Sequence, residues 1–275
     1  MTSLSVIVTT YNRTDALEAV LAGYLDQSDR NFQLVVADDG SGPETAEAVS
    51  RFARSAPFPV LHAWQEDLGF RAAAARNRAI AAARSDYIVF SDGDCVPLPG
   101  FVAGHRRLAE EGWFVTGNRV LLSTGMTGRV LRDPGIVRGR GAAAWASGRL
   151  RGEVNRLLPL LPLPLPALFR KAGGNRWEGA MTCNLAAWRS DLLRVNGLDE
   201  SYSGWGLEDS DLVIRLLRSG VMRKSARFAA PVLHLWHREQ DRSALAENRL
   251  RLEAILKSDQ VRAARGVDRY LPCGL

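Results

Sequence analysis

The sequence has few cysteines and no long apolar run, and each absence excludes a class of protein. Its three cysteines, Cys95, Cys183 and Cys273, stand far apart and form no Cys-x-x-Cys pair. This argues against a disulfide framework or a cysteine-rich zinc site and favours a reducing compartment. No stretch approaches the roughly 18 consecutive apolar residues of a membrane-spanning helix. The first residues carry no basic segment, so we expect no targeting segment and a cytoplasmic location.

Composition and charge indicate a globular protein with anionic partners. Hydrophobic residues make up 46% of the chain and charged residues 24%, which excludes disordered and fibrous classes. The 36 Lys and Arg residues outnumber the 30 Asp and Glu residues, which favours nucleotides, anionic lipid headgroups or nucleic acid as partners. Because the basic residues are scattered, with no platform of aromatic and basic side chains, we expect no nucleic-acid binding.

Strand and helix patterns alternate over the first hundred residues. Helical spacing of apolar residues predicts helices, and short β-branched or apolar runs predict strands. Strands separated by helices imply right-handed crossovers and a parallel sheet flanked by helices. The predicted strands are Leu4–Thr9, Phe32–Ala37, Pro59–Ala63 and Tyr87–Ser91, and the predicted helices begin at Thr14 or span Glu44–Arg54 and Arg71–Ala83.

The pattern changes after residue 122. Residues 123–176 have no clean period and are rich in Pro, Leu and Arg, so we expect an irregular insertion. We expect residues 177–240 to complete the domain that residues 1–122 begin, and residues 241–275 to form a C-terminal helical extension. Within these parts we predict regular structure at Trp177–Leu185, helices near Trp188–Val195 and at Leu207–Ser219, a strand at Val232–Trp236 and a basic amphipathic helix at Ser243–Arg265.

Polar side chains follow three of the predicted parallel strands. Open α/β sheets bind ligands at the carboxyl ends of their strands, so these residues predict a nucleotide site in which a carboxylate accepts from a base or a ribose hydroxyl. Each Asp-Gly pair alone is equally well explained as turn chemistry. The residues are Thr9, Tyr11 and Arg13 after the first strand, Asp38 and Asp39 after the second, and Asp92-Gly93-Asp94 after the fourth.

The Asp-Gly-Asp turn and the alanine-rich helix before it give further evidence for a ligand site. Asp92 and Asp94, separated by one glycine, suit a hard divalent cation that keeps positions for water and a pyrophosphate. The alanine-rich helix before them offers Arg71 and Arg76 to phosphates or to the acidic residues. The alternative for such arginines is plain solvation, which we prefer for Arg78 and Arg84.

A later segment combines aromatic, glycine and acidic residues. Trp205-Gly206 stands directly before Glu208 and Asp209, and Trp177 opens the same segment. Acidic residues at a helix start have an ordinary explanation in the helix dipole. A Gly-Trp-Gly hinge before them is harder to explain as capping and predicts an aromatic wall beside two carboxylates.

In this order the motifs resemble a known family. VIVTTYNR, ADDGS, LGFRAAAARN and SDGD resemble the nucleotide-binding half of family-2 glycosyltransferases, which have the GT-A fold. The segment from WEGAMTCN to SGWGLEDSDL is similar to the acceptor side of β-1,4-galactosyltransferases and bacterial chondroitin-type polymerases. The resemblance covers residues 3–118 and 177–240. It implies an α/β GT-A fold with a Rossmann-like, mostly parallel central sheet.

The resemblance also implies an activity. It implies a metal-dependent inverting transfer of one sugar, from a UDP-hexose or UDP-N-acetylhexosamine, to a hydroxyl of a glycan or lipid-linked acceptor in cell-envelope polysaccharide synthesis. Asp39 would contact the base with support from Asp38, and Arg71 and Arg76 would lie near the diphosphate. Asp92 would face the donor ribose or sugar.

The resemblance further implies a metal and a base. Asp94 would be the main ligand of Mn²⁺ or Mg²⁺, joined by His237 and by His234, where the family has a Met. Asp209 would be the catalytic base, and Glu208 would bind hydroxyls in a pocket with Trp205, Gly206 and Trp177. Leu207 stands where the galactosyltransferases have a glycine.

Elementary chemistry adds four expectations. His234 and His237 share a face only if the chain bends after Leu235, and their imidazoles suit Mn²⁺ better than Mg²⁺. With the usual Asp pKa of about 3.9, Asp209 would be ionised but weakly basic at neutral pH. One base and no covalent intermediate predict inversion.

Alternative interpretations remain open for the insertion and for the function. Leu157–Phe169 and its flanking arginines predict peripheral contact of residues 149–171 with an anionic membrane, unless the leucines cover the protein's own core. A sugar-nucleotide pyrophosphorylase would require a Gly-rich phosphate loop near the start, which is missing. A non-catalytic sugar-nucleotide or glycan-binding protein would leave Asp94 and Asp209 without a role.

Overall fold

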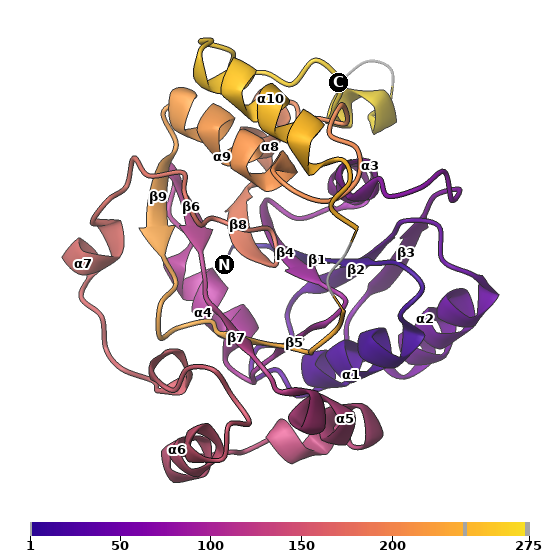
Figure 1. The fold of residues 1–275 in the computed structure, drawn as a ribbon, viewed down its shortest axis with the longest axis vertical. Helices are drawn as coiled ribbons and strands as arrows, with labels where there is room; N and C mark the ends of the chain where they lie inside the picture. Colours follow the sequence, from indigo (N-terminus) through magenta and orange to yellow (C-terminus); the bar gives the residue numbers. More distant parts are fainter. Residues whose placement is uncertain (1, 239–240, 273–275) are drawn as a thin grey trace.

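A central sheet of seven strands organises the molecule (Figure 1). The computed structural model describes residues 2–238 and 241–272, so Cys273 lies outside the described residues. The strand order in the sheet is β3-β2-β1-β4-β8-β6-β9. These strands are β1 (Leu4–Thr10), β2 (Gln33–Asp38), β3 (Val60–Trp64), β4 (Tyr87–Asp92), β6 (Trp113–Thr116), β8 (Asn184–Trp188) and β9 (Met222–Ser225).

Helices cover both faces of this sheet (Figure 1). Apolar side chains of α1 (Thr14–Leu25), α2 (Pro43–Ser55) and α4 (Phe101–Leu108) share one buried cluster. Those of α3 (Ala72–Ala82), α8 (Arg189–Arg194) and α9 (Glu208–Arg218) share the other. The alanines of α3 are buried against the sheet, because their small side chains let the helix approach closely. The α/β fold with a mostly parallel sheet is confirmed.

The first four strands run parallel; β1, β2 and β4 are buried on both faces, whereas the edge strand β3 is partly exposed. β1 pairs with β2 and β4, and β2 pairs with β3, all in parallel. Strands of this kind read as continuous apolar runs rather than alternating ones, and the observed ends differ from the predicted ends by a residue or two. The predicted order of strand and helix over the first hundred residues is therefore confirmed.

β8 joins the second half of the chain to the first. It pairs antiparallel with β4, with Ser91 opposite Asn184, and antiparallel with β6. The start of β8 therefore meets the carboxyl end of β4, and the turns at 177–183 reach the same edge as Asp92. The predicted regular structure at Trp177–Leu185 was wrong for most of its length, since the strand begins only at Asn184.

A small second sheet brings the histidine segment back to this edge. It contains β5 (Cys95–Pro97), β10 (Val232–His234) and β7 (Arg119–Leu121) in the order β5-β10-β7. β10 runs antiparallel to β5, with His234 opposite Cys95. The strand ends at His234, two residues earlier than predicted, so the chain is free to bend before His237.

The C-terminal extension is shorter than expected. α10 spans Leu245–Leu256 and packs on α9 through a small cluster of Ile214, Leu252 and Ile255. The prediction of a helix as far as Arg265 was wrong. The hydroxyl of Ser258 donates to the carbonyl oxygen of Ile255, and such local bonds compete with helix continuation.

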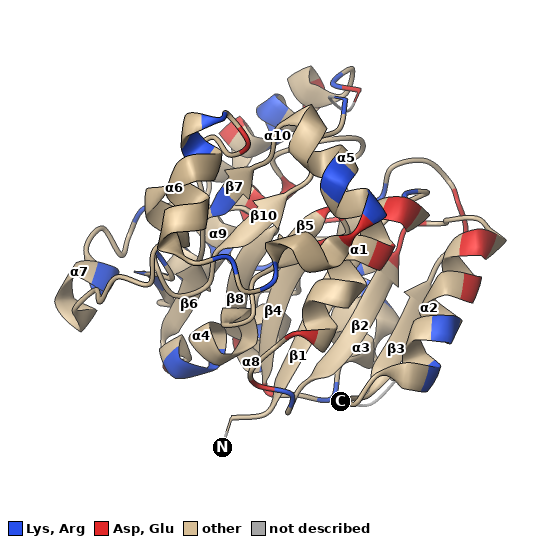
Figure 2. Cartoon of the chain, turned by 90° about the horizontal axis from the view of Figure 1, so that it is seen from below, with Lys and Arg blue, Asp and Glu red and all other residues tan. Residues whose placement is uncertain are grey.

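The insertion is more regular than predicted. Its helices are α5 (Thr124–Arg132), α6 (Ala142–Leu150) and α7 (Ala167–Lys171), with 3-10 turns at Pro134–Val137 and Leu158–Leu160; a third 3-10 turn, Val267–Tyr270, lies near the end of the chain. The helices are short and contain glycines or follow prolines, which hides their period in the sequence. α7 projects from the body of the molecule in both views (Figures 1 and 2). No helix in the described ranges has the length and apolar character needed to cross a membrane.

Candidate functional site

The carboxyl ends of β1, β2 and β4 form one edge of the sheet. Thr10 lies beside Asp38 in the pairing of β1 with β2, and Thr9 lies beside Asp92 in the pairing with β4. The structure thus brings the polar residues predicted after three separate strands to one edge. We call this edge the carboxyl rim.

Gly93 explains the spacing of the two acidic residues on this rim. Its backbone nitrogen donates to the carbonyl oxygen of Thr9 at 2.7 Å. A Cβ at this position would meet the side chain of Thr10 at 3.0 Å and the Thr9 carbonyl oxygen at 3.1 Å. A larger residue would have to displace these neighbours slightly, so glycine favours the close approach of the turn to β1 that sets the directions of Asp92 and Asp94.

Arg76 ties the rim to the second half of the chain. Its Nε donates to Oγ1 of Thr9 at 3.0 Å. Its Nη2 lies 3.0 Å from Oδ1 of Asp92, and its Nη1 lies 3.1 Å from Oε1 of Glu208. Burial opposes the charge of Arg76, but Asp92, Glu208 and Asp209 keep its pKa raised. One guanidinium therefore holds β1, β4 and α9 in a fixed arrangement.

Glu208 and Asp209 begin α9 beside this guanidinium. Arg76 engages Oε1 of Glu208, while Oε2 is buried and has no hydrogen-bond partner among the described residues. Burial, and then the neighbouring charge of Glu208, raise the pKa of Asp209 to about 7. This pKa lies above the ordinary value used in the sequence analysis, because the sequence does not reveal how the folded chain surrounds Asp209.

The loop before α9 has an unusual backbone. Gly204, Gly206 and Leu207 all have positive φ, at 69°, 105° and 78°. Leu207 is thus in the left-handed region where a glycine would be relaxed, and this is the position at which the resemblance predicts a glycine. Trp205 remains 37% exposed, with the Arg242 guanidinium 4.9 Å from its ring centroid.

Asn248 of α10 holds this loop, and the sequence analysis missed it. Its side-chain nitrogen donates to the carbonyl oxygens of Ser203 at 2.9 Å and Gly206 at 3.0 Å. A buried asparagine facing a Gly-rich loop carries no local sequence signal, since the two segments are some forty residues apart. Trp177 does not stand free as a pocket wall; it is partly buried against the cluster beneath α10.

Asp94 lies with two histidines at the other side of the DGD turn. Its Oδ2 is 3.2 Å from Nε2 of His237 and 3.7 Å from Nε2 of His234. The centroids of the two imidazole rings lie 5.1 Å apart, because the chain leaves the strand after His234. The backbone nitrogen of Leu235 donates to the Asp94 carbonyl oxygen at 2.9 Å and fixes this bend.

These three side chains fit a divalent cation. Each offers one ligand atom, and the atoms lie within 4.8 Å of one another. Hydrogen bonding to Asp94 raises the pKa of His237, whereas burial lowers the pKa of His234. Although burial opposes it, the two imidazoles hold the pKa of Asp94 below its usual value. Two imidazoles and a carboxylate suit Mn²⁺.

The acidic pair after β2 is held from inside the protein. Asp38 is fully buried and accepts from the Ser41 backbone nitrogen, with His62 2.8 Å from its Oδ2. Burial opposes ionisation, but these bonds keep the pKa of Asp38 low. Asp38 therefore supports the turn and does not face a ligand directly.

Asp39 is buried as well, with 3% of it exposed. Its two oxygens accept from Nε2 of Gln65 at 2.6 Å and from the Arg71 backbone nitrogen at 2.7 Å. Burial raises the pKa of Asp39. Gln65 follows a predicted strand, but nothing in the sequence pairs it with Asp39.

Exposed aromatic residues surround this pair. Tyr11 and Trp64 are exposed, and the Tyr11 hydroxyl donates to Oδ2 of Asp67 at 2.9 Å. The Arg71 side chain donates to the carbonyl oxygen of Glu66. Arg13 is paired with Asp15 at 2.9 Å. Flat apolar surfaces beside a carboxylate can receive a nucleobase by stacking.

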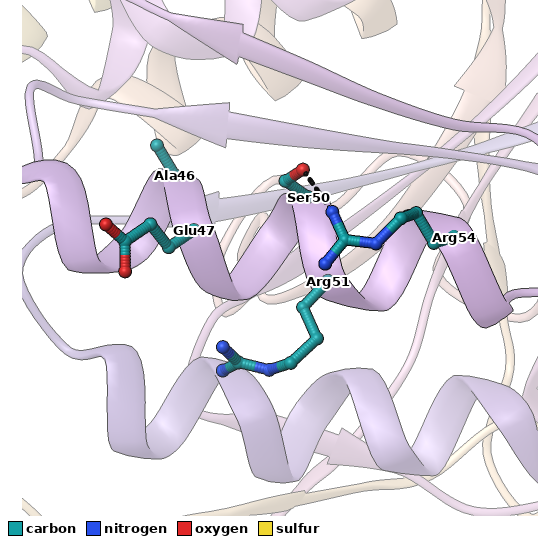
Figure 3. Close-up of a pocket in the computed structure, with 5 residues that line it drawn as sticks. All are labelled: Ala46, Glu47, Ser50, Arg51 and Arg54. Atoms are coloured by element: carbon teal, nitrogen blue, oxygen red, sulfur yellow. Dashed lines mark hydrogen bonds between the residues drawn. The ribbon is translucent and has the colours of Figure 1, made fainter.

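A surface hollow of about 450 Å³ lies elsewhere, along α2 (Figure 3). Its lining includes Ser50, Arg51 and Arg54, and Arg54 donates to the Ser50 hydroxyl at 3.1 Å. Arg51 is paired with Glu18 of α1 at 2.6 Å. These are contacts of a solvated helix face, and none of the lining residues belongs to the carboxyl rim.

Comparison with known proteins identifies two families over different parts of the chain. The model described as glycosyl transferase family 2 matches residues 5–148, just over half of the chain. The model described as the N-terminal domain of galactosyltransferase matches residues 170–238. The two matches together include all residues that meet at the carboxyl rim.

Individual relatives are similar over most of the chain. Validoxylamine A glucosyltransferase of Streptomyces hygroscopicus subsp. jinggangensis is 28% identical over 79% of this chain and 52% of the relative. Chondroitin synthase of Escherichia coli is 26% identical over 82% of this chain and 34% of the relative. The chain therefore spans about half of the length of the first of these proteins and about a third of the second.

Solved structures share the fold. The mannosyltransferase PcManGT of Pyrobaculum calidifontis, in complex with GDP-Man and Mn²⁺, has a TM-score of 0.56 at 20% identity, covering 94% of this chain and 63% of that chain. Residues 1–349 of TarS from S. aureus, in complex with UDP, have a TM-score of 0.60 at 14% identity, covering 98% of this chain and 68% of that chain.

Proposed function

The chain belongs to glycosyl transferase family 2, and we propose that it moves one sugar from a nucleotide-sugar to a hydroxyl of a glycan or lipid-linked acceptor. The donor is a UDP-hexose or UDP-N-acetylhexosamine, and the product belongs to cell-envelope polysaccharide synthesis. The observation that carries the proposal is the set of contacts of Arg76. They join the nucleotide side of the rim to Glu208, the first of the two acidic residues that open α9.

The donor would bind along the carboxyl rim. Asp39, oriented by Gln65 and Arg71, faces the base, and Thr9, Tyr11 and Arg13 lie beside it. Asp92, held by Arg76, receives the hydroxyls of the donor ribose or sugar. The free Oε2 of Glu208 accepts a hydrogen bond from a sugar hydroxyl, which explains an otherwise costly unsatisfied group.

Asp94, His234 and His237 would hold Mn²⁺, or Mg²⁺ in its place. When bound there, the cation supplies Lewis-acid stabilisation of negative charge on the departing diphosphate. The chain itself positions the ligands. The bend after His234, and the hydrogen bond from the Leu235 backbone nitrogen to the Asp94 carbonyl oxygen, keep the two imidazoles beside the Asp94 carboxylate. Binding of Mn²⁺ to PcManGT is consistent with this proposal.

Asp209 would take the proton of the attacking acceptor hydroxyl. A base is most effective when its pKa lies near the working pH, and such assistance contributes about 10²–10⁴ in rate. The pKa of about 7 meets that condition. With one base and no covalent intermediate, an α-linked donor gives a β-glycoside.

The insertion would bring the enzyme to its acceptor at the inner face of a membrane. Leu160 is only 7% exposed and covers the core, whereas Leu150, Leu168 and Phe169 are 90%, 79% and 63% exposed. The adjacent exposed side chains of Leu168 and Phe169 on α7 would form an apolar interaction surface. Basic residues between 149 and 171 match anionic lipid headgroups.

Release of UDP tests the catalytic proposal. A panel of UDP-sugars is assayed with and without Mn²⁺, using wild type and Asp209→Asn. We expect Mn²⁺-dependent release from one donor and a loss of about 10²–10⁴ in the variant. Donor binding without turnover would support a non-catalytic binding protein, and full activity of Asp209→Asn would exclude Asp209 as the base.

Vesicle binding tests the membrane proposal. Leu168→Ser with Phe169→Ser should weaken cosedimentation with phosphatidylglycerol vesicles by about tenfold or more, because two apolar side chains no longer enter the interface. Leu250→Ser is the matched control, since Leu250 is exposed on α10, outside the insertion. Equal binding by all three chains, or none by wild type, would contradict the proposal.

A further inference from the structure

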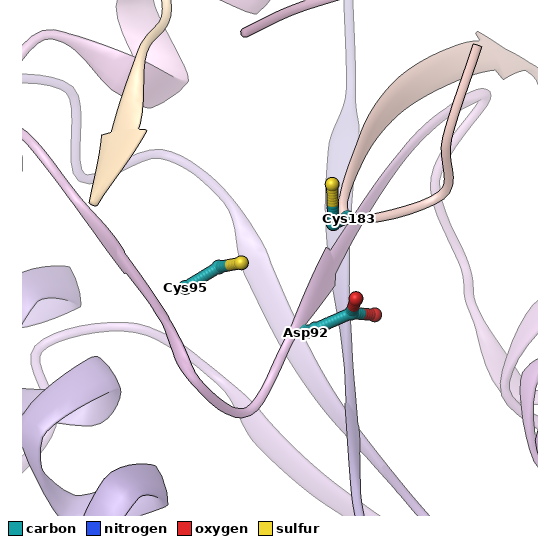
Figure 4. Close-up of side chains that lie close together, drawn as sticks. All are labelled: Asp92, Cys95 and Cys183. Carbon is teal, nitrogen blue, oxygen red and sulfur yellow. The ribbon is translucent and has the colours of Figure 1, made fainter. Parts of the chain in front are cut away.

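Two of the cysteines meet beside Asp92. Asp92, Cys95 and Cys183 each offer one ligand atom, and these atoms all lie within 4.8 Å of one another (Figure 4). Asp92 ends β4, Cys95 begins β5 and Cys183 directly precedes β8. Both cysteines are free thiols and are buried. The wide spacing that argued against a cysteine site in the sequence is closed by the fold.

The pairing of the strands explains this meeting. Ser91 of β4 lies opposite Asn184 of β8, so the residues that follow and precede them, Asp92 and Cys183, are also neighbours. The tight turn at Gly93 then returns the chain so that Cys95 lies close to both. Two separate backbone segments, the turn from β4 to β5 and the residues before β8, therefore hold the three groups in place.

Unsatisfied hydroxyls lie on the same side of the sheet. Thr10 Oγ1, Tyr24 Oη and Ser91 Oγ are buried and lack hydrogen-bond partners among the described residues. Side chains alternate along a strand, so Ser91 shares its face with Tyr87 and Val89, whose core cluster also contains Tyr24, Cys95 and Cys183. The two cysteines therefore lie among core residues on the face of the sheet that also carries these hydroxyls.

We propose that Asp92, Cys95 and Cys183 form a second metal site, specific for a thiophilic divalent cation such as Zn²⁺. Thiolate sulfur selects Zn²⁺ and similar ions, whereas carboxylate and imidazole ligands also accept Mn²⁺. The thiol site therefore selects against Mn²⁺, whereas the Asp94 site can hold either ion. Arg76 holds Oδ1 of Asp92, so Oδ2 is the oxygen that would ligate.

The distances suit such an ion after a small closure. With Zn–S bonds of about 2.3 Å and Zn–O bonds of about 2.0–2.2 Å, ligand atoms around a tetrahedral ion lie roughly 3.5–3.8 Å apart. The present separations exceed this by about 1 Å or less, which rotation of the side chains can supply. Water completes the coordination, and the two thiol protons are released to solvent on binding.

Occupation of this site would inhibit the enzyme. Asp92 is shared between the thiol site and the proposed donor site, so a cation on Asp92 competes with the donor sugar and adds charge beside Arg76. The inference about binding does not rest on the proposed function, because the three ligands and the unsatisfied hydroxyls stand without it.

Cobalt spectroscopy tests the site. Co²⁺ is titrated into the reduced full-length chain carrying Cys273→Ser, which removes the third thiol. We expect a sulfur-to-cobalt charge-transfer band that Zn²⁺ abolishes at one equivalent. The band should be lost in Cys183→Ser, which preserves side-chain size, and also in Cys183→Ala. It should persist in His237→Ala, which weakens the Asp94 site.

Each other outcome overturns the proposal. Absence of the band in the parent chain, its persistence in both folded Cys183 variants, or its loss in His237→Ala would each do so. Circular dichroism checks that each variant folds. If one of the two Cys183 variants does not fold, the other still tests the proposal.

Inhibition gives an independent measurement. At saturating Mn²⁺, Zn²⁺ should inhibit UDP release at least about tenfold less effectively in Cys183→Ser than in the parent, the size of effect expected when a metal site is weakened. Mn²⁺-dependent activity without Zn²⁺ should be unchanged. If the chain proves inactive, the cobalt band still decides whether the site exists.

Discussion

The two sides of the carboxyl rim are built differently. On the donor side, Asp38 and Asp39 are buried and their oxygens are satisfied by the protein's own groups. On the acceptor side, Glu208 keeps an unsatisfied oxygen and Leu207 a left-handed backbone. The two carboxylates of the donor side are thus satisfied without a ligand, whereas the acceptor side retains strain and a carboxylate oxygen with an unmet hydrogen bond that a substrate would relieve.

Arg76→Met should lower the stability more than any other substitution considered, because it removes the residue that joins the two sides of the carboxyl rim. Asp92 and Glu208 would lose their shared cation, and an uncompensated buried charge costs about 3–5 kcal/mol. Thermal or urea unfolding measures the loss. Arg84→Ala is the control, because this exposed residue should change stability by no more than about 0.5 kcal/mol. Equal stability of wild type and Arg76→Met would mean that the two sides are not joined through Arg76.

The pH dependence should separate the acceptor side from the donor side. Since only ionised Asp209 can act as a base, activity should rise with pH through about 7. The charge of Glu208 is the second cause of that raised pKa, so Glu208→Gln should shift the acidic limb of the kcat profile to lower pH. An unshifted limb would assign the titration to another group.

The free energy of unfolding should also depend on the ionisation of Asp209. It should fall as pH rises, whereas activity should increase. Folded Asp209 keeps its proton up to about pH 7, whereas the unfolded chain loses it near pH 4. The folded state therefore binds more protons between these values, and its stability falls as pH rises through this window. Asp209→Asn should raise Tm at pH 8 and have little effect at pH 4; a lower Tm at pH 8 would contradict the sign.

Asn248→Ala should loosen the acceptor loop alone. Two carbonyl oxygens, those of Ser203 and Gly206, would lose their donor, which costs about 1–3 kcal/mol when they stay buried. We expect a higher KM for the acceptor with an unchanged KM for the donor. Equal changes in both constants would show that the loop also shapes the donor side.

Leu207→Gly should have the smallest effect. A left-handed leucine costs roughly 1–2 kcal/mol, but a glycine adds about 0.5–1 kcal/mol of unfolded-state entropy. The two nearly cancel, so we expect Tm to change by no more than about 5 °C. A drop well beyond that would mean that packing of the Leu207 side chain against the α10 cluster outweighs its backbone strain.

The sequence predicted the frame of the fold because its signals are local. Buried parallel strands appear as apolar runs, and the acidic turns that follow them must meet at one edge. The short helices of residues 123–176 were missed because glycine and proline interrupt their period. The end of α10 was misplaced because the bond from Ser258 to Ile255 depends on local geometry rather than on hydropathy.

Contacts between segments that are distant in the sequence could not be predicted from it. Which carboxylates Arg76 binds, and that Asn248 holds the loop, follow from how α3, α9 and α10 pack. The raised pKa of Asp209 depends on burial, which its neighbours in the chain do not reveal. The meeting of Cys95 with Cys183 depends on the pairing of β4 with β8, to which residue spacing alone gives no access.

The direct pairing of β8 with β4 has a mechanical consequence. The segment that carries the acceptor side is hydrogen-bonded into the same sheet as the nucleotide side, so the two cannot rotate apart as separate lobes without breaking that ladder. Enclosure of substrates in this molecule therefore falls to loops at the edge of a rigid platform. Differences in specificity among chains with this architecture should accordingly arise from loop exchange, with the platform left unaltered.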